Sequence, residues 1–199
     1  MPTQRPTHKD LARFYLRRRR HHKSGQAQLE AAFTRAVASC LEPLGPHATL
    51  AAFLPLGGEP PIRPALDACW EQGVRVLVPR TLPQGQLEWV DYQPKAPLVR
   101  NRLGILEPQG PAVAPQAFWA ASLRLIPALA LDLQGTRLGQ GGGYYDRLLS
   151  QRGSAPLDRT SLAVIFEDEI LDGLPADPWE ARFEYALTEQ GVRQLAPRG

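Results

Sequence analysis

The fold of this chain is decided by residues 137–146, which read RLGQGGGYYD, and by the segments on either side of them. An apolar run over residues 123–131 precedes the stretch, and a helix-like Arg147-Leu148-Leu149 follows it. Four glycines within five positions let the backbone adopt positive φ and approach a ligand closely. A glycine loop that opens a helix also presents free N–H groups that favour a phosphate. The stretch therefore predicts a strand–loop–helix unit, either as a nucleotide loop or as a tight turn.

This loop differs from the two commonest nucleotide motifs. A GxxxxGK[ST] loop is absent, and GxGxxG would need a glycine where Tyr144 stands. Ligands of open α/β sheets lie beyond the carboxyl ends of the strands, where such a loop is expected. Asp146 suits either the dipole of the following helix or a Mg²⁺ ion shared with phosphate oxygens. The rings of Tyr144 and Tyr145 either line a ligand site or pack in the core.

Strands and helices alternate on both sides of this unit. We expect strands over residues 48–56, 74–79, 87–92, 123–131, 161–166 and 183–188, with a bend or an end at Pro127. We expect helices after an N-cap at Thr7 and over residues 29–41, 61–72 and 145–151, a short helix or turn over residues 169–174, and mostly loops in the proline-rich residues 93–122. The alternation predicts an α/β, layered Rossmann-like fold with a largely parallel central sheet flanked by helices, plus an N-terminal helical arm. The length of 199 residues predicts a single domain, 1–199.

The apolar spacing predicts which helix faces are buried. Leu11, Phe14 and Tyr15 share one face of the first helix. In the helix over 61–72, an inward face is expected to include Trp70, together with Ile62, Ala65, Leu66 and Cys69.

Composition excludes several classes of protein. No apolar run approaches the roughly 20 residues of a membrane span, and the polar N-terminus lacks a signal-peptide core, so a cytoplasmic location is expected. Cys40 and Cys69 lie in apolar helix faces without a CxxC pair, so neither a zinc site nor a disulfide framework is expected. No Ser–His or Cys–His arrangement is visible. The pattern favours positioned phosphoryl transfer over a side-chain nucleophile.

Two charged features have two interpretations each. Residues 17–23 read RRRRHHK, which is either a solvated helix face or a site for a polyanion such as RNA. Glu59 follows the first strand in GGEPP, either as a surface acid or as an acceptor for an amino-heterocycle.

The segment IPALALD at residues 126–132, followed by residues 135–146, closely resembles the signature of the 5-formyltetrahydrofolate cyclo-ligase family, also called 5,10-methenyltetrahydrofolate synthetases. Four further segments are similar to this family in the right order. They are Lys9 with Ala12, Arg13 and Arg20; Phe53-Leu54 to Glu59; residues 101–108; and Leu174-Pro175 to Trp179-Glu180 with Leu187-Thr188-Glu189.

The resemblance implies an ATP-dependent ligase that needs Mg²⁺. Such an enzyme closes 5-formyltetrahydrofolate to 5,10-methenyltetrahydrofolate and releases ADP and phosphate. The formyl oxygen would be phosphorylated, folate N10 would attack the formyl carbon, and phosphate would depart. The protein would mainly align the reactants and neutralise charge, which requires no histidine or cysteine.

The resemblance also implies roles for individual residues. The ATP site would comprise Lys9, Arg13, Arg137, Leu138, Gly139, Gln140, Gly141, Gly142, Gly143, Tyr144 and Tyr145. The folate site would comprise Leu54, Glu59, Gly141, Gly142, Gly143 and Tyr144. Arg137 and Tyr144 would be catalytic, and Asp146 and Glu180 would bind Mg²⁺.

The chain departs from the family pattern in two acidic places. Glu180 stands where the family commonly has Asp, and residues 166–169 (FEDE) stand where it usually has a Gln. Two other functions are compatible with the sequence: an RNA-binding module on an α/β scaffold, and a relative that only stores or senses folates. Intact Arg137, Gly143 and Asp146 argue against the second. We expect a monomer with a folate substrate, polyglutamylated or not, and no membrane or nucleic-acid partner.

Overall fold

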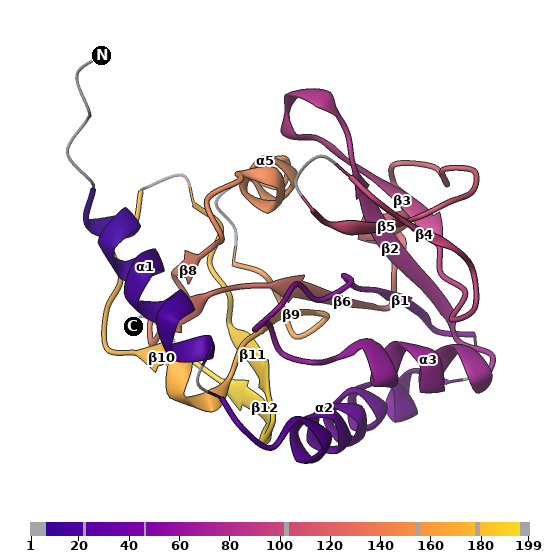
Figure 1. Ribbon diagram of the computed structural model, residues 1–199, viewed down its shortest axis with the longest axis horizontal. Coiled ribbons are helices and arrows are strands. Elements are labelled where there is room, and N and C mark those ends of the chain that lie inside the picture. Colours follow the sequence, from indigo (N-terminus) through magenta and orange to yellow (C-terminus); the bar gives the residue numbers. More distant parts are fainter. Residues whose placement is uncertain are drawn as a thin grey trace.

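The computed structural model describes residues 7–21, 23–45, 47–101, 104–153, 156–177 and 180–195. A seven-stranded sheet has the order β12-β11-β9-β6-β1-β2-β3 and runs through the centre of the molecule (Figure 1). Its strands are β1 (Thr49–Ala51), β2 (Arg75–Thr81), β3 (Leu87–Asp91), β6 (Leu123–Pro127), β9 (Ser161–Val164), β11 (Tyr185–Thr188) and β12 (Gly191–Gln194). The five inner strands pair in parallel, and only β3 and β12 at the edges are antiparallel. The predicted largely parallel α/β sheet is therefore confirmed.

Both faces of this sheet are buried, as expected for parallel strands. Along β1, Leu50 belongs to one apolar cluster and Ala51 to the cluster on the other face. Along β2, Val76 and Val78 belong to the same cluster as Leu50, and Leu77 belongs to the same cluster as Ala51. Successive side chains of a strand point to opposite faces, so short apolar runs can fill two cores at once.

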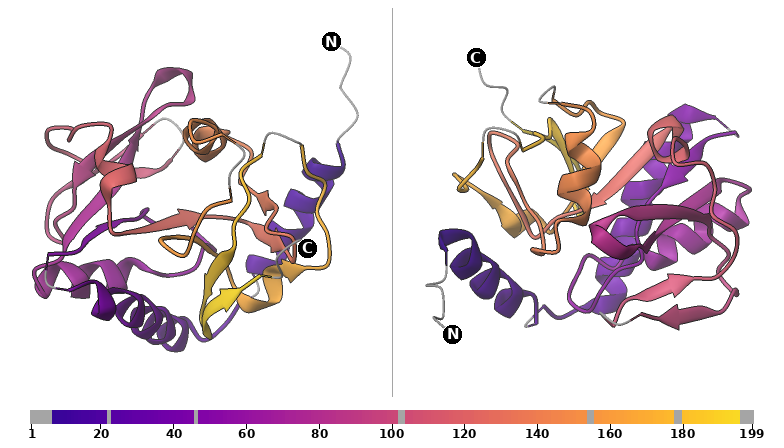
Figure 2. Two further views of the ribbon diagram at one scale, coloured as in Figure 1. Left: turned by 180° about the vertical axis from the view of Figure 1, so that it is seen from behind. Right: turned by 90° about the horizontal axis from the view of Figure 1, so that it is seen from above.

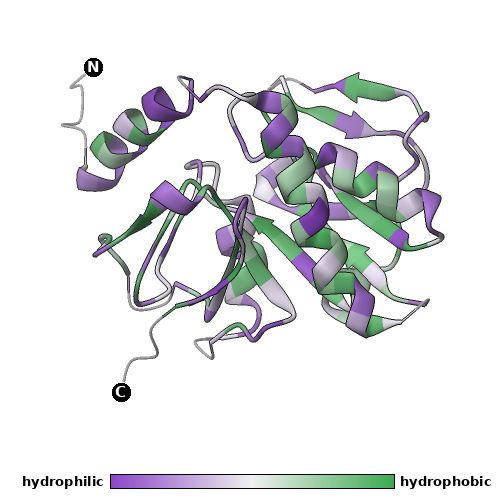
Figure 3. Cartoon of the chain, turned by 90° about the horizontal axis from the view of Figure 1, so that it is seen from below, coloured by the Kyte–Doolittle hydropathy of each residue, from purple (hydrophilic) through white to green (hydrophobic). Residues whose placement is uncertain are grey.

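Helices α2 (Gln26–Leu41) and α3 (Arg63–Glu71) cover one face of the sheet. Figure 3 views this side, with the largely hydrophobic strands behind the two helices. Helices α4 (Ala117–Ala120) and α5 (Tyr144–Ser150) contribute Phe118, Leu148 and Leu149 to the other core. The predicted inward face of α3 is wrong for Trp70, which is 44% exposed, because the buried stripe of the helix runs through Ala65, Leu66 and Cys69 and the next residue turns away from it.

A second, three-stranded sheet has the order β10-β7-β8. The predicted interruption at Pro127 is confirmed, because β6 ends there and the chain resumes as β7 (Ala130–Asp132) in this small sheet. Strands β8 (Arg137–Leu138) and β10 (Ile170–Leu171) complete it. The prediction of a short helix or turn over residues 169–174 is thus wrong for Ile170 and Leu171, which pair with Leu131 and Asp132 of β7.

Helix α1 (His8–Arg20) lies beside the small sheet and away from α2 and α3 (Figure 2). Its N-cap at Thr7 is confirmed, with a capping box formed with Asp10. The predicted apolar face is not the packed one: Phe14 is 58% exposed, whereas Leu16 contacts Leu129 and Leu138 in a small buried cluster.

A hairpin, a short helix and several 3-10 turns add structure that the sequence did not indicate. Residues 93–122, expected as loop, contain the hairpin of β4 (Leu98–Arg100) and β5 (Leu106–Pro108) as well as α4. The short 3-10 turns are η1 (Glu42–Leu44), η2 (Pro83–Gly85) and η3 (Glu167–Glu169). None of the helices in the described ranges is long and apolar enough to cross a membrane.

Candidate active site

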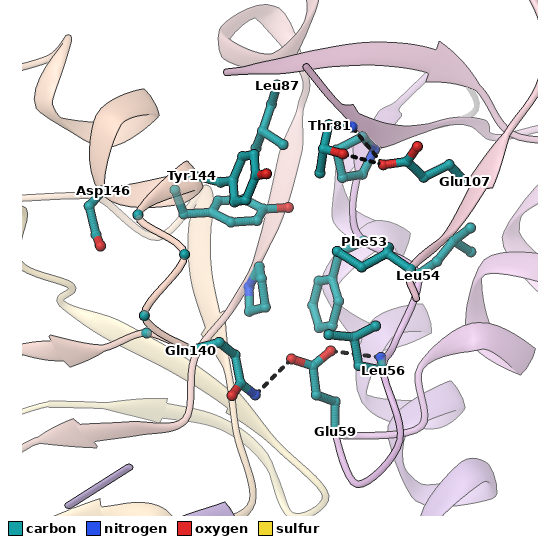
Figure 4. Close-up of a pocket in the computed structure, with 18 of the residues that line it drawn as sticks. Phe53, Leu54, Leu56, Glu59, Thr81, Leu87, Glu107, Gln140, Tyr144 and Asp146 are labelled. Carbon is teal, nitrogen blue, oxygen red and sulfur yellow. Dashed lines mark hydrogen bonds between the residues drawn. The ribbon is translucent and has the colours of Figure 1, made fainter. Parts of the chain in front are cut away.

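A cavity of about 500 Å³ lies at the carboxyl ends of the parallel strands. Phe53 and Leu54 follow β1, Thr81 ends β2, and Pro127 ends β6, and all four line it. Residues 139–143 close the opposite side, as Figure 4 shows. The glycine loop therefore faces a ligand-sized space at the position expected for an open α/β sheet.

Glu59 presents a buried carboxylate to this cavity and is only 8% exposed. Its Oε2 accepts the backbone N–H of Leu56 at 2.9 Å, and its Oε1 accepts Nε2 of Gln140 at 3.1 Å (Figure 4). Burial raises the pKa of Glu59, while these two hydrogen bonds act in the opposite direction. An acceptor held in this way can bind the N–H groups of an amino-heterocycle.

Tyr145 leaves a polar group without a partner beside the cavity that it helps to line. Its hydroxyl is buried and makes no hydrogen bond within the part of the chain that the structure describes. Burial raises the pKa of Tyr145, the negative charge of Glu59 adds to the shift, and Arg137 opposes it. A neutral, orphaned donor at this place fits a cavity that takes a polar ligand.

Helix α1 forms a wall of the site through its arginines. Arg13 Nε donates to the carbonyl oxygen of Gly139 at 3.0 Å. Arg17 Nε donates to Oε1 of Gln140 at 3.0 Å, and its Nη2 donates to the backbone carbonyl of Gln140. Gln140 thus links Arg17 to Glu59. Arg17 itself lines the cavity, a position that the sequence left open between surface and site.

The two predicted metal ligands, Asp146 and Glu180, line one small cavity of about 150 Å³. Arg137 lies between this space and the main cavity, lines both, and pairs with Asp146. Its Nη1 also donates to the carbonyl oxygen of Pro127 at 2.8 Å. Figure 4 shows Asp146 beyond the glycine backbone, at the edge of the main cavity.

Lys9 reaches the same region from α1. Its Nζ lies 2.7 Å from Oε1 of Glu180 and 2.8 Å from Oδ2 of Asp177. Burial lowers the pKa of Lys9, but the hydrogen bonds to Asp177 and Glu180 outweigh it and raise the pKa overall. Lys9 and Glu180 are thereby brought together across the chain.

These residues fit a Mg²⁺ ion that is held partly by phosphate. The described residues contain no group of three or more His, Cys, Asp or Glu side chains able to form a complete protein cage. Mg²⁺ typically takes one or two carboxylates and completes its shell with water and phosphate oxygens. Asp146 and Glu180 supply that number of carboxylates, and their role as Mg²⁺ ligands stays a prediction.

The basic run of α1 is not a free cationic face. Arg20 is buried, and its Nε lies 2.7 Å from Oε1 of Glu169. Arg19 and Lys23 both pair with Asp168, at 3.0 and 2.8 Å. Asp168 and Glu169 therefore neutralise part of the basic run, whereas Glu167 pairs with Arg193 of β12 at 3.2 Å. These contacts do not favour an RNA-binding role for the run.

Sequence reasoning missed a second buried carboxylate in the main cavity. Oε1 of Glu107 accepts the backbone N–H and Oγ1 of Thr81 at 2.8 and 2.6 Å, and Nδ2 of Asn101 at 2.8 Å. Thr81 and Glu107 lie across the cavity from Gln140 and Glu59 in Figure 4. The available signal was an isolated acid between the apolar residues of β5. His22, Arg102, Leu103 and Trp179, which carried part of the resemblance or of the basic run, lie outside the described residues.

A sequence model described as the 5-formyltetrahydrofolate cyclo-ligase family matches residues 5–189. The chain belongs to this family. Curated relatives agree: the 5-formyltetrahydrofolate cyclo-ligase of Mycolicibacterium smegmatis is 37% identical over 153 residues, covering 74% of this chain and 77% of the relative. The Escherichia coli enzyme of the same name is 31% identical over 146 residues, covering 72% and 79%. The predicted resemblance is confirmed, and the chain is a ligase-type enzyme.

Solved structures show the same fold. The NMR structure of Aquifex aeolicus 5,10-methenyltetrahydrofolate synthetase matches with a TM-score of 0.71 and 26% identity, covering 97% of this chain and 96% of that one. A 5,10-methenyltetrahydrofolate synthetase from Mycoplasma pneumoniae matches with a TM-score of 0.66 at 20% identity, covering 89% and 96%. The second likeness bears on the fold alone.

Proposed function

We propose that this protein converts 5-formyltetrahydrofolate and ATP into 5,10-methenyltetrahydrofolate, ADP and phosphate, with Mg²⁺ as cofactor. The observation that carries the proposal is that one cavity joins the glycine loop to the buried carboxylate of Glu59 through Gln140. A nucleotide loop and an acceptor for an amino-heterocycle thus face each other across a space of substrate size.

In the proposed site the pterin lies against Leu54 and Glu59, because its amino and ring N–H groups need a buried acceptor. The triphosphate lies along residues 139–143 and is neutralised by Arg13 and Lys9 from α1. Arg137 lines both cavities and pairs with Asp146, so it is suited to the charge that develops on a transferred phosphoryl group. The Tyr144 ring lines the main cavity and orients the reactants.

The proposed chemistry begins at the formyl oxygen, which attacks the γ-phosphorus of ATP and releases ADP. Folate N10 then bonds to the formyl carbon and loses its proton, and the carbon–oxygen bond breaks as phosphate departs. The site aligns the formyl oxygen with the nucleotide and excludes water, which converts an encounter of two substrates into an intramolecular step. No side-chain nucleophile is required.

Mg²⁺ would be held by Asp146 and Glu180 and would neutralise phosphate charge. Arg137 currently pairs with Asp146, so this guanidinium can shift toward phosphate when the carboxylate takes a cation. The longer side chain of Glu180, where the family commonly has Asp, is compatible with this role because it still lines the small cavity.

The test is the growth of methenyltetrahydrofolate absorbance with purified protein, 5-formyltetrahydrofolate, ATP and Mg²⁺. The proposal expects product only when all three are present. Folded protein that gives no product under these conditions would instead be a relative that binds folates without converting them.

Variants separate the metal and nucleotide assignments. Asp146→Ala should lower turnover by roughly a hundredfold or more, because the loss falls on charge stabilised in the transition state. Asp172→Ala removes an exposed aspartate outside both cavities and should have no effect. Lys9→Ala should raise the KM for ATP more than that for folate, and an equal or reversed effect would contradict the placement of Lys9.

Three further expectations stay predictions: that residues 1–199 act as one 5-formyltetrahydrofolate cyclo-ligase-like domain, that the protein is a cytoplasmic monomer, and that its folate substrate is polyglutamylated or not.

A further inference from the structure

A smaller cavity of about 170 Å³ adjoins the main one. The two spaces share Leu54, Leu56 and Leu106 as walls. Figure 4 shows Leu56 beside Glu59, where the pterin is proposed to lie, and Leu54 next to Phe53 on the same side of the main cavity. A ligand that leaves the pterin position past these leucines enters the smaller space.

Two arginines line this smaller cavity. Arg63 begins α3, Arg100 ends β4, and both are exposed, so the Arg63–Arg100 cavity opens to solvent. Its lining within the described residues includes no Asp or Glu. Arg100 Nη1 donates to the neutral carbonyl oxygen of Gly104 at 2.6 Å, which leaves its charge uncompensated.

The surroundings of Arg63 compensate its charge only in part. Arg63 interacts with the hydroxyl of Tyr92 and opposes the rise in its pKa, and this hydroxyl itself donates a hydrogen bond to Oδ1 of Asp67 at 2.5 Å. Asp67 does not line the Arg63–Arg100 cavity. Both arginines therefore present positive charge to a space that begins with apolar walls.

A neighbouring cavity of about 460 Å³ shares Arg63 with this one, but two of its other basic residues are already paired. There Arg20 pairs with Glu169 and Lys23 pairs with Asp168. Glu30 and Glu59 add negative charge to its lining. Of these two cavities, the Arg63–Arg100 cavity is the better match for an anion, because no Asp or Glu of the described chain lines it.

We propose that the Arg63–Arg100 cavity binds the glutamate carboxylates of the folate substrate. A folate places a flat aromatic ring between its pterin and a glutamate that carries two carboxylates. With the pterin at Glu59, the ring packs against Leu54 and Leu106 and the carboxylates reach the two guanidinium groups, which bind such anions well. Because the cavity is open, further glutamates can continue outward. This inference rests on the proposed function.

The test compares two ligands that differ only in the glutamate: 5-formyltetrahydrofolate and 5-formyltetrahydropteroate. Binding is measured by calorimetry without ATP, and turnover by methenyl absorbance. Arg63→Gln and Arg100→Gln should each weaken binding of the folate by roughly three- to tenfold, as expected for partly exposed ion pairs. The same variants should bind the pteroate as the wild type does. Arg63→Lys, which keeps the charge, should retain more affinity than Arg63→Gln.

Arg35→Gln is the matched control, because Arg35 is an exposed arginine of α2 that lines neither cavity. Equal losses for folate and pteroate, or no loss for either, would overturn the proposal. A rise in the KM for ATP alone would assign the arginines to the nucleotide instead. Since the calorimetric comparison needs no turnover, an inactive but folate-binding protein would still decide this question.

Discussion

Replacing Glu169 by leucine should release helix α1 from the body of the protein. Arg20 and Glu169 form a two-point ion pair, with Nε to Oε1 and Nη2 to Oε2 both at 2.7 Å, and each side chain is 3% exposed. Arg20 also donates to the carbonyl oxygen of Ala128 at 2.7 Å. Besides Arg20, only Leu16 is buried along α1, so this pair is the main anchor of the helix.

The expected loss follows from the burial of the guanidinium. Removing one partner of a buried ion pair costs about 3–5 kcal/mol, because the other charge is left uncompensated. If α1 undocks to hydrate Arg20, backbone amides of α1 should exchange with solvent faster by on the order of two to four factors of ten. The KM for ATP should rise as well, since Lys9 and Arg13 are carried on this helix. Hydrogen exchange followed by mass spectrometry, together with a urea titration of global stability, measures both effects.

Two comparisons make the reasoning refutable. Asp168→Asn removes a half-exposed partner of Arg19 and Lys23 in the same segment and should cost no more than about 1 kcal/mol. The double variant Arg20→Met with Glu169→Leu should recover at least half of the loss, because no charge stays buried. If α1 exchange in Glu169→Leu matched that of Asp168→Asn, or if the double variant undocked further, the pair would not anchor the helix.

Three further predictions concern the turn at Gly135, the unpartnered hydroxyl of Tyr145 and the buried carboxylate of Glu59. At Gly135, with φ of +79°, a Cβ would lie 2.0 Å from the carbonyl oxygen of Phe183, whereas Gly73, with φ of +83°, has open space around it. Urea titration should therefore show a loss of about 3 kcal/mol for Gly135→Ala and about 1 kcal/mol for Gly73→Ala, and equal losses would discount the contact. Tyr145→Phe should leave the free energy of unfolding within about 0.5 kcal/mol of wild type while weakening ligand binding, since the hydroxyl has no partner in the described chain. Burial raises the pKa of Glu59 above the usual value of about 4.3. Because the ionised carboxylate is the proposed acceptor, the KM for 5-formyltetrahydrofolate should rise as pH falls through that raised pKa. If a Glu59→Gln variant showed the same dependence of KM on pH, Glu59 would be excluded as its source.

Much of the sheet could be predicted from the sequence because its strands carry their signal locally. The run over residues 123–131 is apolar on both alternating faces, which is typical of a parallel strand covered on two sides. Pro127 marked the place where the chain leaves the large sheet, since proline cannot donate to the ladder. Thr7 and Asp10 predicted the start of α1, because a capping box spans only four residues.

The candidate site was predictable where its residues adjoin along the chain. The glycine loop over residues 139–143 carries its own conformational signature, and Glu59 follows the strand predicted over residues 48–56, which in the structure ends at Ala51. Glu107 was missed because its partner Thr81 lies 26 residues away, and nothing near it in the sequence announces that contact. Arg63 and Arg100, which we propose bind the folate glutamate, were missed for the same reason, because they lie on separate elements, α3 and β4.

By itself, the sequence determined the α/β class, the glycine loop and the start of the first helix, because each of these depends on neighbours within a few positions. Only the tertiary structure decided what the basic run does. Its Arg20 is buried against a glutamate 149 residues away, while Phe14, which the spacing grouped on the apolar face, stays in solvent. Whether a charge is solvated or buried depends on whether a partner offsets its desolvation, and that partner is fixed by packing rather than by sequence proximity.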